Sequence, residues 1–287
     1  MRTDIRYVNR RGEVLELGGT DEALHYMEHE LRDWEWSYST GKGSGRVTSF
    51  SRRPSKPRKV KLPVGIAAAT GERGLELRNR VLAVGEPDVL AGEPGELWLG
   101  DWSMRCWIVA GQPTRYWYDD RYAEVSLTLL VEDPSWVRAT TRLLVPETAS
   151  AAGGTDFLRD LPCDLLRERA STTVTVAGDS PSPFLWRTFG PATSPYLRIA
   201  GNLYRVNVDV PEGARLEVDS RDRRVELVLA DGTRTSQYAL RERGASGSGS
   251  YIFEEIPCGD SAFAWGNDAR MELVTYEVRS AAPYEEG

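Results

Sequence analysis

Two histidines, His25 and His29, are the only imidazole side chains in this chain that can act as a base or a metal ligand. Residues 25–29 read H-Y-M-E-H, which fits the H-x-x-E-H pattern of one class of zinc peptidases. That chemistry requires a helix, because a helix brings residues four apart to one face. Residues 20–22 have the types that begin helices, but an aromatic pattern of period two follows from Asp33. We therefore interpret both histidines as polar surface residues and expect neither a catalytic nor a metal site.

Other catalytic signatures are incomplete. Gly41-Lys42 is followed by Gly43, where a phosphate-binding loop needs Ser or Thr. The sequence has no G-x-S-x-G elbow, and no G-x-G-x-x-G follows an expected strand. Neighbouring acids such as Asp119 and Asp120 would point to opposite faces of a strand, so they do not form the facing carboxylates of a glycosidase. The sequence predicts a protein that is not an enzyme and needs no cofactor.

Positive charge is concentrated in one segment, residues 41–61. The chain has 36 Lys and Arg against 43 Asp and Glu, a net charge of −7. Residues 41–61 contain no acid and eight cations: Lys42, Arg46, Arg52, Arg53, Lys56, Arg58, Lys59 and Lys61. Without these eight charges, the net charge of −7 becomes −15 for the rest of the chain. Because like charges repel, we expect the segment to form an extended hairpin or arm that water or an acidic partner screens.

Two interpretations of this basic segment stay open. It is either a solvated loop or charged edge strand that deters aggregation, or a contact with an acidic surface. That surface would belong to a neighbouring copy or to an adjoining protein. The contact hypothesis assigns partner or subunit contact to Arg52, Arg53, Lys56, Arg58, Lys59 and Lys61. The negative charge of the whole chain disfavours a general nucleic-acid binder, and we expect no specific nucleic-acid binding.

Length and composition are those of a folded globular protein. The 287 residues, 40% hydrophobic and 28% charged, are enough for one large or two ordinary domains. No apolar run approaches the roughly 18 to 20 residues that cross a bilayer, and the first residues have no apolar signal core. We expect a protein without membrane association or a secretion signal. Its three widely spaced cysteines fit neither a disulfide framework nor a zinc knuckle.

The elements expected before residue 145 are short strands and one helix. The aromatic alternation predicts a strand at residues 33–39. Further strands are expected at 60–68, at 96–111 around a Gly100-Asp101 turn, and within 121–136, where Asp133-Pro134 ends the strand. Apolar residues at helical intervals predict one helix over Arg73–Leu90, although Gly85 and Pro87 weaken its last turns.

The chain after residue 145 reads as a linker followed by a β domain. We expect a first domain at residues 1–145, a linker at 146–170 and a second domain at 171–287. Short strands without intervening helices predict an antiparallel β-sandwich in the second domain. The eight expected strands are residues 172–178, 196–201, 203–210, 214–220, 223–230, 250–256, 261–266 and 271–280.

The nine tryptophans allow two interpretations. In alternating strands they supply core or subunit-interface area, which is the interpretation we favour. Exposed on one face, they would stack on sugars, as in a carbohydrate-binding lectin-like module. Four of them fall within twenty residues: Trp98, Trp102, Trp107 and Trp117.

Several stretches together resemble the distal tail protein (Dit) of long, non-contractile tailed phages and related prophage tail components. One is residues 31–38, L-R-D-W-E-W-S-Y. A second is D-V-L-A-G-E-P-G-E-L-W-L-G-D at 88–101, followed by C-W-I at 106–108. A third is E-V-S-L-T at 124–128 with D-P-S-W at 133–136. In the second domain the similar stretches keep the family's order: 178–183, 204–207, 218–220, 252–259 and 276–280.

This resemblance implies a mainly β protein with a tail-tube-like N-terminal domain containing one helix and a galectin-like C-terminal β-sandwich. It implies a homohexameric ring, the baseplate hub of a siphovirus or prophage virion. That ring joins the major tail tube protein to a tail-associated tip protein or receptor-binding protein for host adhesion. It also implies a place at the virion tail tip, after assembly in the host cytoplasm. The family has no catalytic or metal residues to carry over. The linker at 158–166, LRDLPCDLL, departs from it by lacking tyrosines.

Overall fold

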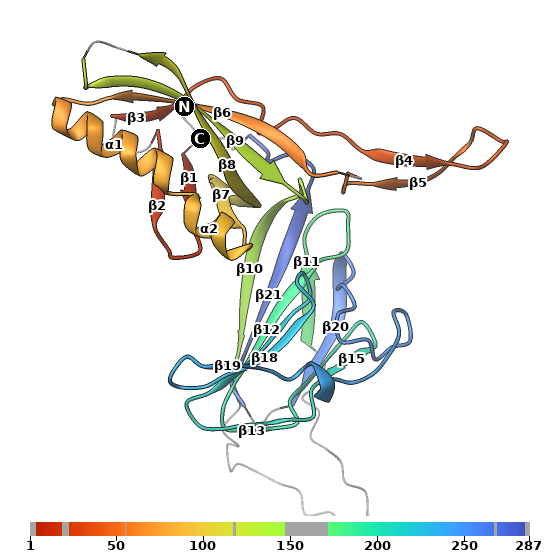
Figure 1. Cartoon of the computed structure of the whole chain (residues 1–287). Coiled ribbons are helices and arrows are strands. Elements are labelled where there is room, and N and C mark those ends of the chain that lie inside the picture. Colours follow the sequence, from red (N-terminus) through yellow and green to blue (C-terminus); the bar gives the residue numbers. More distant parts are fainter. Residues whose placement is uncertain are drawn as a thin grey trace, which may run out of the picture. The chain divides into compact units, whose positions relative to one another are not determined.

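The computed structural model describes residues 4–18, 23–54, 56–116, 119–146, 172–266 and 269–284. The expected mainly β architecture is confirmed (Figure 1). The chain divides into two compact units: unit 1 is Met1–Arg138 with Arg279–Gly287, and unit 2 is Ala139–Val278. It passes from one unit to the other within β10 (Trp136–Leu144) and again within β21 (Met271–Arg279). Most of the predicted linker lies outside the described residues, so the predicted domain boundaries stay a prediction.

The strands of unit 1 form antiparallel ladders that meet at β8. On one side the order is β3-β6-β9-β8, and β6 pairs with β9 over ten residues. The first part of β8 pairs with β7, β7 with β1, and β1 with β2. The bounds are β1 (Ile5–Val8), β2 (Val14–Leu17), β3 (Leu24–Tyr26), β6 (Arg58–Ala67), β7 (Gly95–Leu99), β8 (Trp102–Tyr116) and β9 (Tyr122–Val131).

Alternation of side chains decides which face of β6 is covered. Val60, Leu62, Val64 and Ile66 are all at most 3% exposed and belong to the core of unit 1. Successive residues of a strand point to opposite faces, so the intervening positions belong to the other face. The strands expected at 60–68, 96–111 and 121–136 are present, and the last of them ends at Val131, just before the Asp133-Pro134 expected to end it.

The expected single helix is interrupted, which corrects the prediction for Arg73–Leu90. Two helices occur instead, α1 (Gly71–Ala83) and α2 (Glu86–Ala91). Thr70 caps α1 by accepting a hydrogen bond from the Arg73 amide, as N-cap residues do. Pro87 has no amide hydrogen to continue the ladder. At the break, a Cβ on Gly85 would lie 2.6 Å from the Ile108 Cβ, so glycine allows the close approach to β8.

A buried carboxyl group attaches α2 to β1. The Tyr7 hydroxyl donates to Asp88 Oδ2, and the Arg10 amide donates to Asp88 Oδ1 at 2.8 Å. Both side chains are at most 1% exposed. Burial, followed by the hydrogen bond to Asp88, raises the pKa of Tyr7 far above its ordinary value. Gly95 lies against this pair, since a Cβ there would be 2.4 Å from the Tyr7 hydroxyl oxygen.

Unit 2 contains two antiparallel sheets whose inner residues share one core. The first has the order β19-β18-β17-β12-β21 and the second β11-β20-β14-β15. Trp186, Leu216, Leu197 and Phe263 are at most 1% exposed and belong to the same cluster. The strands are β11 (Thr172–Val176), β12 (Phe184–Phe189), β14 (Tyr196–Ile199), β15 (Asn202–Arg205), β17 (Arg215–Asp219), β18 (Arg224–Val228), β19 (Arg234–Ser236) and β20 (Gly259–Trp265); β13 (Ala192–Thr193) pairs separately with β16 (Asp209–Val210).

Two predictions for unit 2 are wrong in detail. Residues 250–256 form no strand, because side chains bind their backbone: Asn202 exchanges hydrogen bonds with the Tyr251 amide and carbonyl, and Tyr204 donates to the Glu254 carbonyl at 2.9 Å. The single strand expected at residues 203–210 is interrupted, because β15 ends at Arg205 and β16 begins at Asp209. Strand β12 was not predicted from the sequence. The two-sheet arrangement agrees with a sandwich, and its galectin-like character stays a prediction.

Charges on one sheet of unit 2 are paired across neighbouring strands. Glu217 on β17 contacts Arg187 at 3.5 Å, Arg215 at 2.7 Å and Arg234 at 2.8 Å. Arg187 also contacts Glu272 on β21 at 3.0 Å. Burial raises the pKa of Glu217, but the hydrogen bonds from Arg215 and Arg234 outweigh it and leave the pKa below its usual value. These charges are therefore satisfied within unit 2.

No helix among the described residues has the length and apolar character needed to span a membrane.

Replacing Tyr7 by phenylalanine should loosen α2, because it removes the hydroxyl that binds Asp88. A buried acceptor that loses its partner costs about 1–3 kcal/mol. We expect the opening free energy of the β1 and α2 amides to fall by that amount in native-state hydrogen exchange. Tyr284→Phe is the matched control, since Tyr284 is 81% exposed. Unchanged exchange in Tyr7→Phe would show that this hydrogen bond does not hold the helix.

Candidate assembly interface

A two-stranded ribbon contains part of the basic segment. β4 (Ser37–Thr40) pairs with β5 (Val47–Ser51), and all nine strand residues are exposed. Figure 1 shows this ribbon extending away from the rest of unit 1, and we call residues 37–51 the arm. The sequence predicts an extended hairpin or arm over residues 41–61. The hairpin contains the first part of that segment, whereas residues 58–61 begin β6.

The expected strand at residues 33–39 begins later, at Ser37. Its partner β5 ends at Ser51, so residues 33–36 have no strand opposite them in this ribbon. These residues form the base of the arm instead.

The two faces of the arm differ in chemistry. Tyr38 and Phe50 are directly opposite each other, and each is 66% exposed. The Trp36 ring meets Phe50 edge-on, with centroids 6.5 Å apart. Because side chains alternate along a strand, these three rings form one face, which we call the aromatic face. The opposite face contains the cross-strand pairs Ser37 with Ser51 and Ser39 with Ser49.

Glycines allow the tight turn at the tip of the arm. The Gly41 amide donates to the Arg46 carbonyl at 2.9 Å. Gly43 and Gly45 have φ angles of 82° and 62°, the left-handed region that favours glycine. The turn exposes Arg46 at the far end of the ribbon, next to β5.

The base of the arm is held by the first residue of β10 and by the segment that precedes it. The Trp136 side chain is 1% exposed, and its Nε1 donates to the Leu31 carbonyl at 3.2 Å. Arg53 contacts Asp133 at 2.9 Å. Burial raises the pKa of Asp133, but hydrogen bonds from Ser135 and Arg53 outweigh it and leave the pKa below its usual value. Asp133 therefore stays charged beside Arg53 at neutral pH.

The end of the chain also contacts the base. Arg32 donates to the Ala282 carbonyl at 3.1 Å, and its guanidinium lies 4.0 Å from the centre of the Tyr284 ring. Ala282 is 2% exposed and belongs to the same core cluster as Leu31. Residues 282–284 thus help to fix the point where the arm begins.

Four of the six predicted contact residues have partners within unit 1. Arg52 lies over the Trp36 ring at 5.0 Å, and Arg53 binds Asp133. Arg58 donates to the Asp33 carbonyl at 2.6 Å, and Lys61 donates to Thr128 at 2.7 Å. The other two, Lys56 and Lys59, are exposed. A role of the six in binding a partner stays a prediction.

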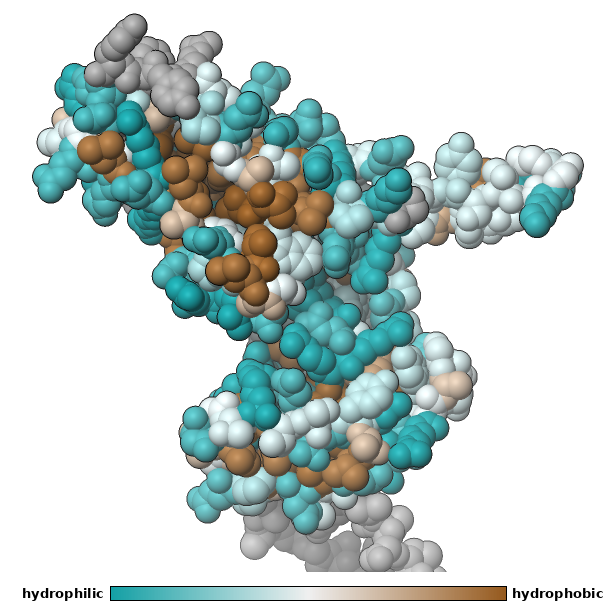
Figure 2. Space-filling view, in the orientation of Figure 1, coloured by the Kyte–Doolittle hydropathy of each residue, from teal (hydrophilic) through white to brown (hydrophobic). Residues whose placement is uncertain are grey.

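An apolar surface on the helices was not foreseen from the sequence. Of the apolar residues at helical intervals between 73 and 90, Leu77, Val81 and Val84 are buried, but Leu82 is 54% exposed. Figure 2 shows apolar side chains gathered where Figure 1 places α1, α2 and β8. We define the helix patch as five exposed apolar residues: Leu75, Leu82, Val89, Leu90 and Val109. The sequence signal for this surface is the number of apolar residues in the helical region, which is more than one face of a helix can bury.

The helix patch spans α1, α2 and β8. Leu75 and Leu82 are seven residues apart and so lie on one face of α1. A Cβ on Gly111 of β8 would lie 3.2 Å from Leu82 Cδ2, which places the end of α1 beside β8.

The two histidines do not have the geometry of a zinc peptidase. His25 lies in strand β3, and His29 lies after that strand, outside any helix. The His25 ring lies over Gly65, where a Cβ would be 2.3 Å from Nε2. Burial lowers the pKa of His29. In the described part of the chain, no three His, Cys, Asp or Glu side chains gather as a metal site.

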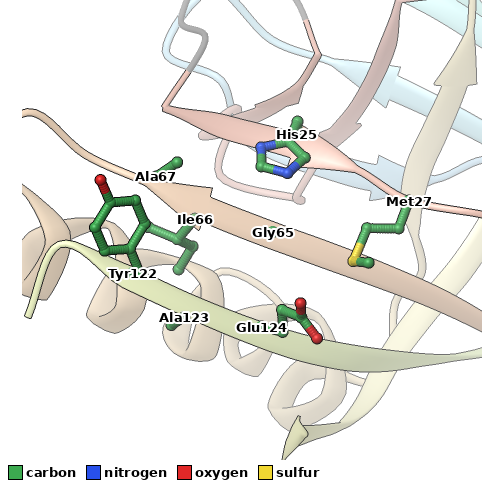
Figure 3. Close-up of a pocket in the computed structure, with 8 residues that line it drawn as sticks. All are labelled: His25, Met27, Gly65, Ile66, Ala67, Tyr122, Ala123 and Glu124. Carbon is green, nitrogen blue, oxygen red and sulfur yellow. The ribbon is translucent and has the colours of Figure 1, made fainter. Parts of the chain in front are cut away.

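A shallow hollow lies beside His25, on the face of β3, β6 and β9 (Figure 3). Glu124 is the register partner of Gly65, and Met27 and Tyr122 also line the hollow. These side chains include no Ser, Thr or Cys nucleophile and one carboxylate. The hollow therefore does not present a pair of acids or a nucleophile with its base.

Comparison with known proteins found similarity only in structure. No family model matches the chain, and no curated protein matches its sequence. The crystal structure of the SPP1 Dit protein, described as a paradigm of the hub adsorption apparatus in phages infecting Gram-positive bacteria, is similar with a TM-score of 0.51 at 13% identity. The alignment covers 97% of this chain and all of that one.

A second solved assembly gives the same result. Chains of the phage P2 baseplate in its activated conformation, with Ca or with Sr, are similar with TM-scores of 0.62 and 0.63 at 10% identity. Each alignment covers 98% of this chain and all of the other. The chain therefore has the fold of Dit and baseplate proteins, which confirms the resemblance seen in the sequence.

Replacing Trp136 by phenylalanine should loosen the base of the arm. The change removes the donor to Leu31 and leaves space in the core, at a cost of about 1–3 kcal/mol. We expect faster hydrogen exchange at residues 27–36 than in the parent protein. Trp34→Phe is the control, because Trp34 is 62% exposed. If both variants exchange alike at these residues, the Trp136 contact does not hold the arm.

Proposed function

We propose that this chain is a structural protein of a phage or prophage tail. Its copies form a six-membered ring, a hub that joins the tail tube to the tip or baseplate and the host-adhesion machinery. The similarity over the whole length of Dit and baseplate chains is the observation that carries this proposal, because both units and their order along the chain are covered.

The arm supports assembly into a ring. A two-stranded ribbon is marginally stable in water, and an exposed aromatic face gains stability when another surface covers it. An interface in which one patch binds a different patch of the next copy forms a ring when the rotation closes. Unit 1 is the part of the chain that we assign to this ring.

The proposed partners follow from the same role. The ring would bind the major tail tube protein on one side and a tail-associated tip protein or receptor-binding protein on the other. Its place would be the virion tail tip, after assembly in the host cytoplasm. Catalysis is not part of this role, and the hollow at His25 offers no nucleophile for it.

A carbohydrate-binding module is the weaker alternative. Among the described residues of unit 2, Tyr238 is the exposed aromatic side chain that could stack on a sugar. One contact of its ring is the Arg241 guanidinium, 3.6 Å from the ring centre, and another is Phe253, stacked at 5.9 Å. Internal contacts therefore already occupy this ring.

The ring itself is directly testable. The purified chain at tens of micromolar should give six-fold rings in negative-stain micrographs and the mass of a hexamer by light scattering. The control is the same protein in mild denaturant, which should show monomers. A uniformly monomeric protein without rings would contradict the proposed function.

Reversing the exposed charges Lys56 and Lys59 to glutamate should weaken assembly if the basic segment contacts an acidic surface. We expect the concentration for half assembly to rise about tenfold at low salt, and the parent assembly to loosen as salt screens the contact. Arg11→Glu reverses an exposed charge elsewhere in unit 1 and should have little effect. Unchanged assembly of the Lys56 and Lys59 variant at low salt would leave the solvated-segment interpretation.

A further inference from the structure

The hollow beside His25 combines three different kinds of metal-binding donor. Its lining includes the imidazole of His25, the thioether of Met27 and the carboxylate of Glu124. We propose that these three side chains bind a copper ion in the Cu(I) state. The site does not depend on the proposed ring, and it differs from the zinc-peptidase pattern because His29 takes no part in it.

Strand pairing places the three donors on one face of the sheet. His25 on β3 is the register partner of Gly65 on β6, and Gly65 is the register partner of Glu124 on β9. Register partners share a face, as do residues two apart in a strand. The Met27 amide donates to the Pro63 carbonyl at 2.9 Å, which continues the ladder past β3 and places Met27 on the His25 face. Figure 3 shows Gly65 lying between His25 and Glu124.

Gly65 keeps the space between the donors open. Its φ angle lies outside the left-handed region, so the backbone conformation does not require glycine there. The requirement is space, because a Cβ would lie 2.3 Å from His25 Nε2 and 2.7 Å from His25 Cε1. The imidazole therefore lies across the backbone of β6. Two strand spacings, about 10 Å, separate the backbones of β3 and β9, and the side chains of His25 and Glu124 extend into that gap.

The imidazole and the thioether are accessible to an ion. No hydrogen bond or ion pair joins the His25 imidazole to another residue that the structure describes, and His25 is half-buried. Met27 is 39% exposed, whereas Met104 and Met271 are at most 3% exposed. In the described part of the chain, Met27 is thus the methionine whose sulfur can reach a metal from solution.

The donor set favours copper over other common ions. Thioethers select Cu(I), and imidazole also suits copper. Zinc usually takes thiolate, imidazole and carboxylate ligands, and calcium and magnesium take oxygen ligands. The Glu124 carboxylate offsets the positive charge of the ion. A copper ion held here would tie the three-residue strand β3 to β9 across β6.

Copper titration tests the site. A background with Cys163→Ser and Cys258→Ser removes thiols that would bind Cu(I), and Cys106 remains but is buried. This protein competes for Cu(I) with a chromogenic chelator in the absence of oxygen, and we expect one bound ion per chain. Loss of an outer-shell partner alone costs about 10–100-fold in affinity, so Met27→Leu should weaken binding at least about tenfold. His29→Gln is the matched control and should bind as the background protein does.

X-ray absorption at the copper edge provides a second measurement, because it identifies the ligand atoms. The spectrum of the background protein should contain a sulfur neighbour that disappears in Met27→Leu, a change that nearly conserves volume. Gly65→Ala should also weaken binding, since the added methyl group displaces the imidazole. Circular dichroism shows whether each variant keeps its fold.

Three results would overturn this inference: a background protein that binds no Cu(I), a copper spectrum without sulfur, or equal affinity in the background protein and Met27→Leu. Zinc bound in preference to Cu(I) would overturn the assignment to copper. Each of these results leaves the proposed hub intact, because the ring is tested separately by micrographs and light scattering.

Discussion

The hydrogen bond from the buried Trp136 indole to the Leu31 carbonyl joins two segments on which the rest of unit 1 depends. Leu31 is the last core residue before the arm, and Trp136 opens β10, through which the chain leaves unit 1. The buried Trp136 ring cannot shift without leaving a cavity in the core. The start of the arm and the start of β10 are therefore held together. Arg58, Arg53 and Arg32 add contacts around this point. The arm therefore projects from a base that is packed into the core of unit 1.

The charges on one sheet of unit 2 and those of the basic segment differ in how they are paired. In unit 2 the acids of neighbouring strands are paired with arginines, as at Glu217, and these pairs are satisfied internally. In the basic segment, the residues closest to the core have internal partners, while Lys56 and Lys59 remain exposed. Charge that stabilises the fold and charge that is available to a partner thus lie in adjacent positions of one segment.

The apolar side chains of unit 1 are likewise divided between those packed in the core and those left exposed. The core of unit 1 takes Leu77, Val81 and Val84 from the helical region and leaves Leu82 and Leu90 outside. Keeping such residues exposed is unfavourable for an isolated chain and favourable for one that assembles. In the hub that we propose, neighbouring subunits would cover this surface.

The sequence alone determined the mainly β class, most strands and the basic segment. It also indicated that Gly85 and Pro87 weaken the end of the expected helix. These features can be predicted because period-two alternation, turn residues and charge are local properties. The tertiary structure decided the rest. The loop at 250–256 has strand-like residues, but Asn202 and Tyr204 bind its backbone from elsewhere in the chain. The pairing of Tyr38 with Phe50 depends on hairpin register, which neither segment reveals separately. Which leucines of the helices stay exposed depends on how closely Gly85 and Gly111 let the helices approach β8. Contacts between residues far apart in the chain are set by packing, and a single sequence does not state them.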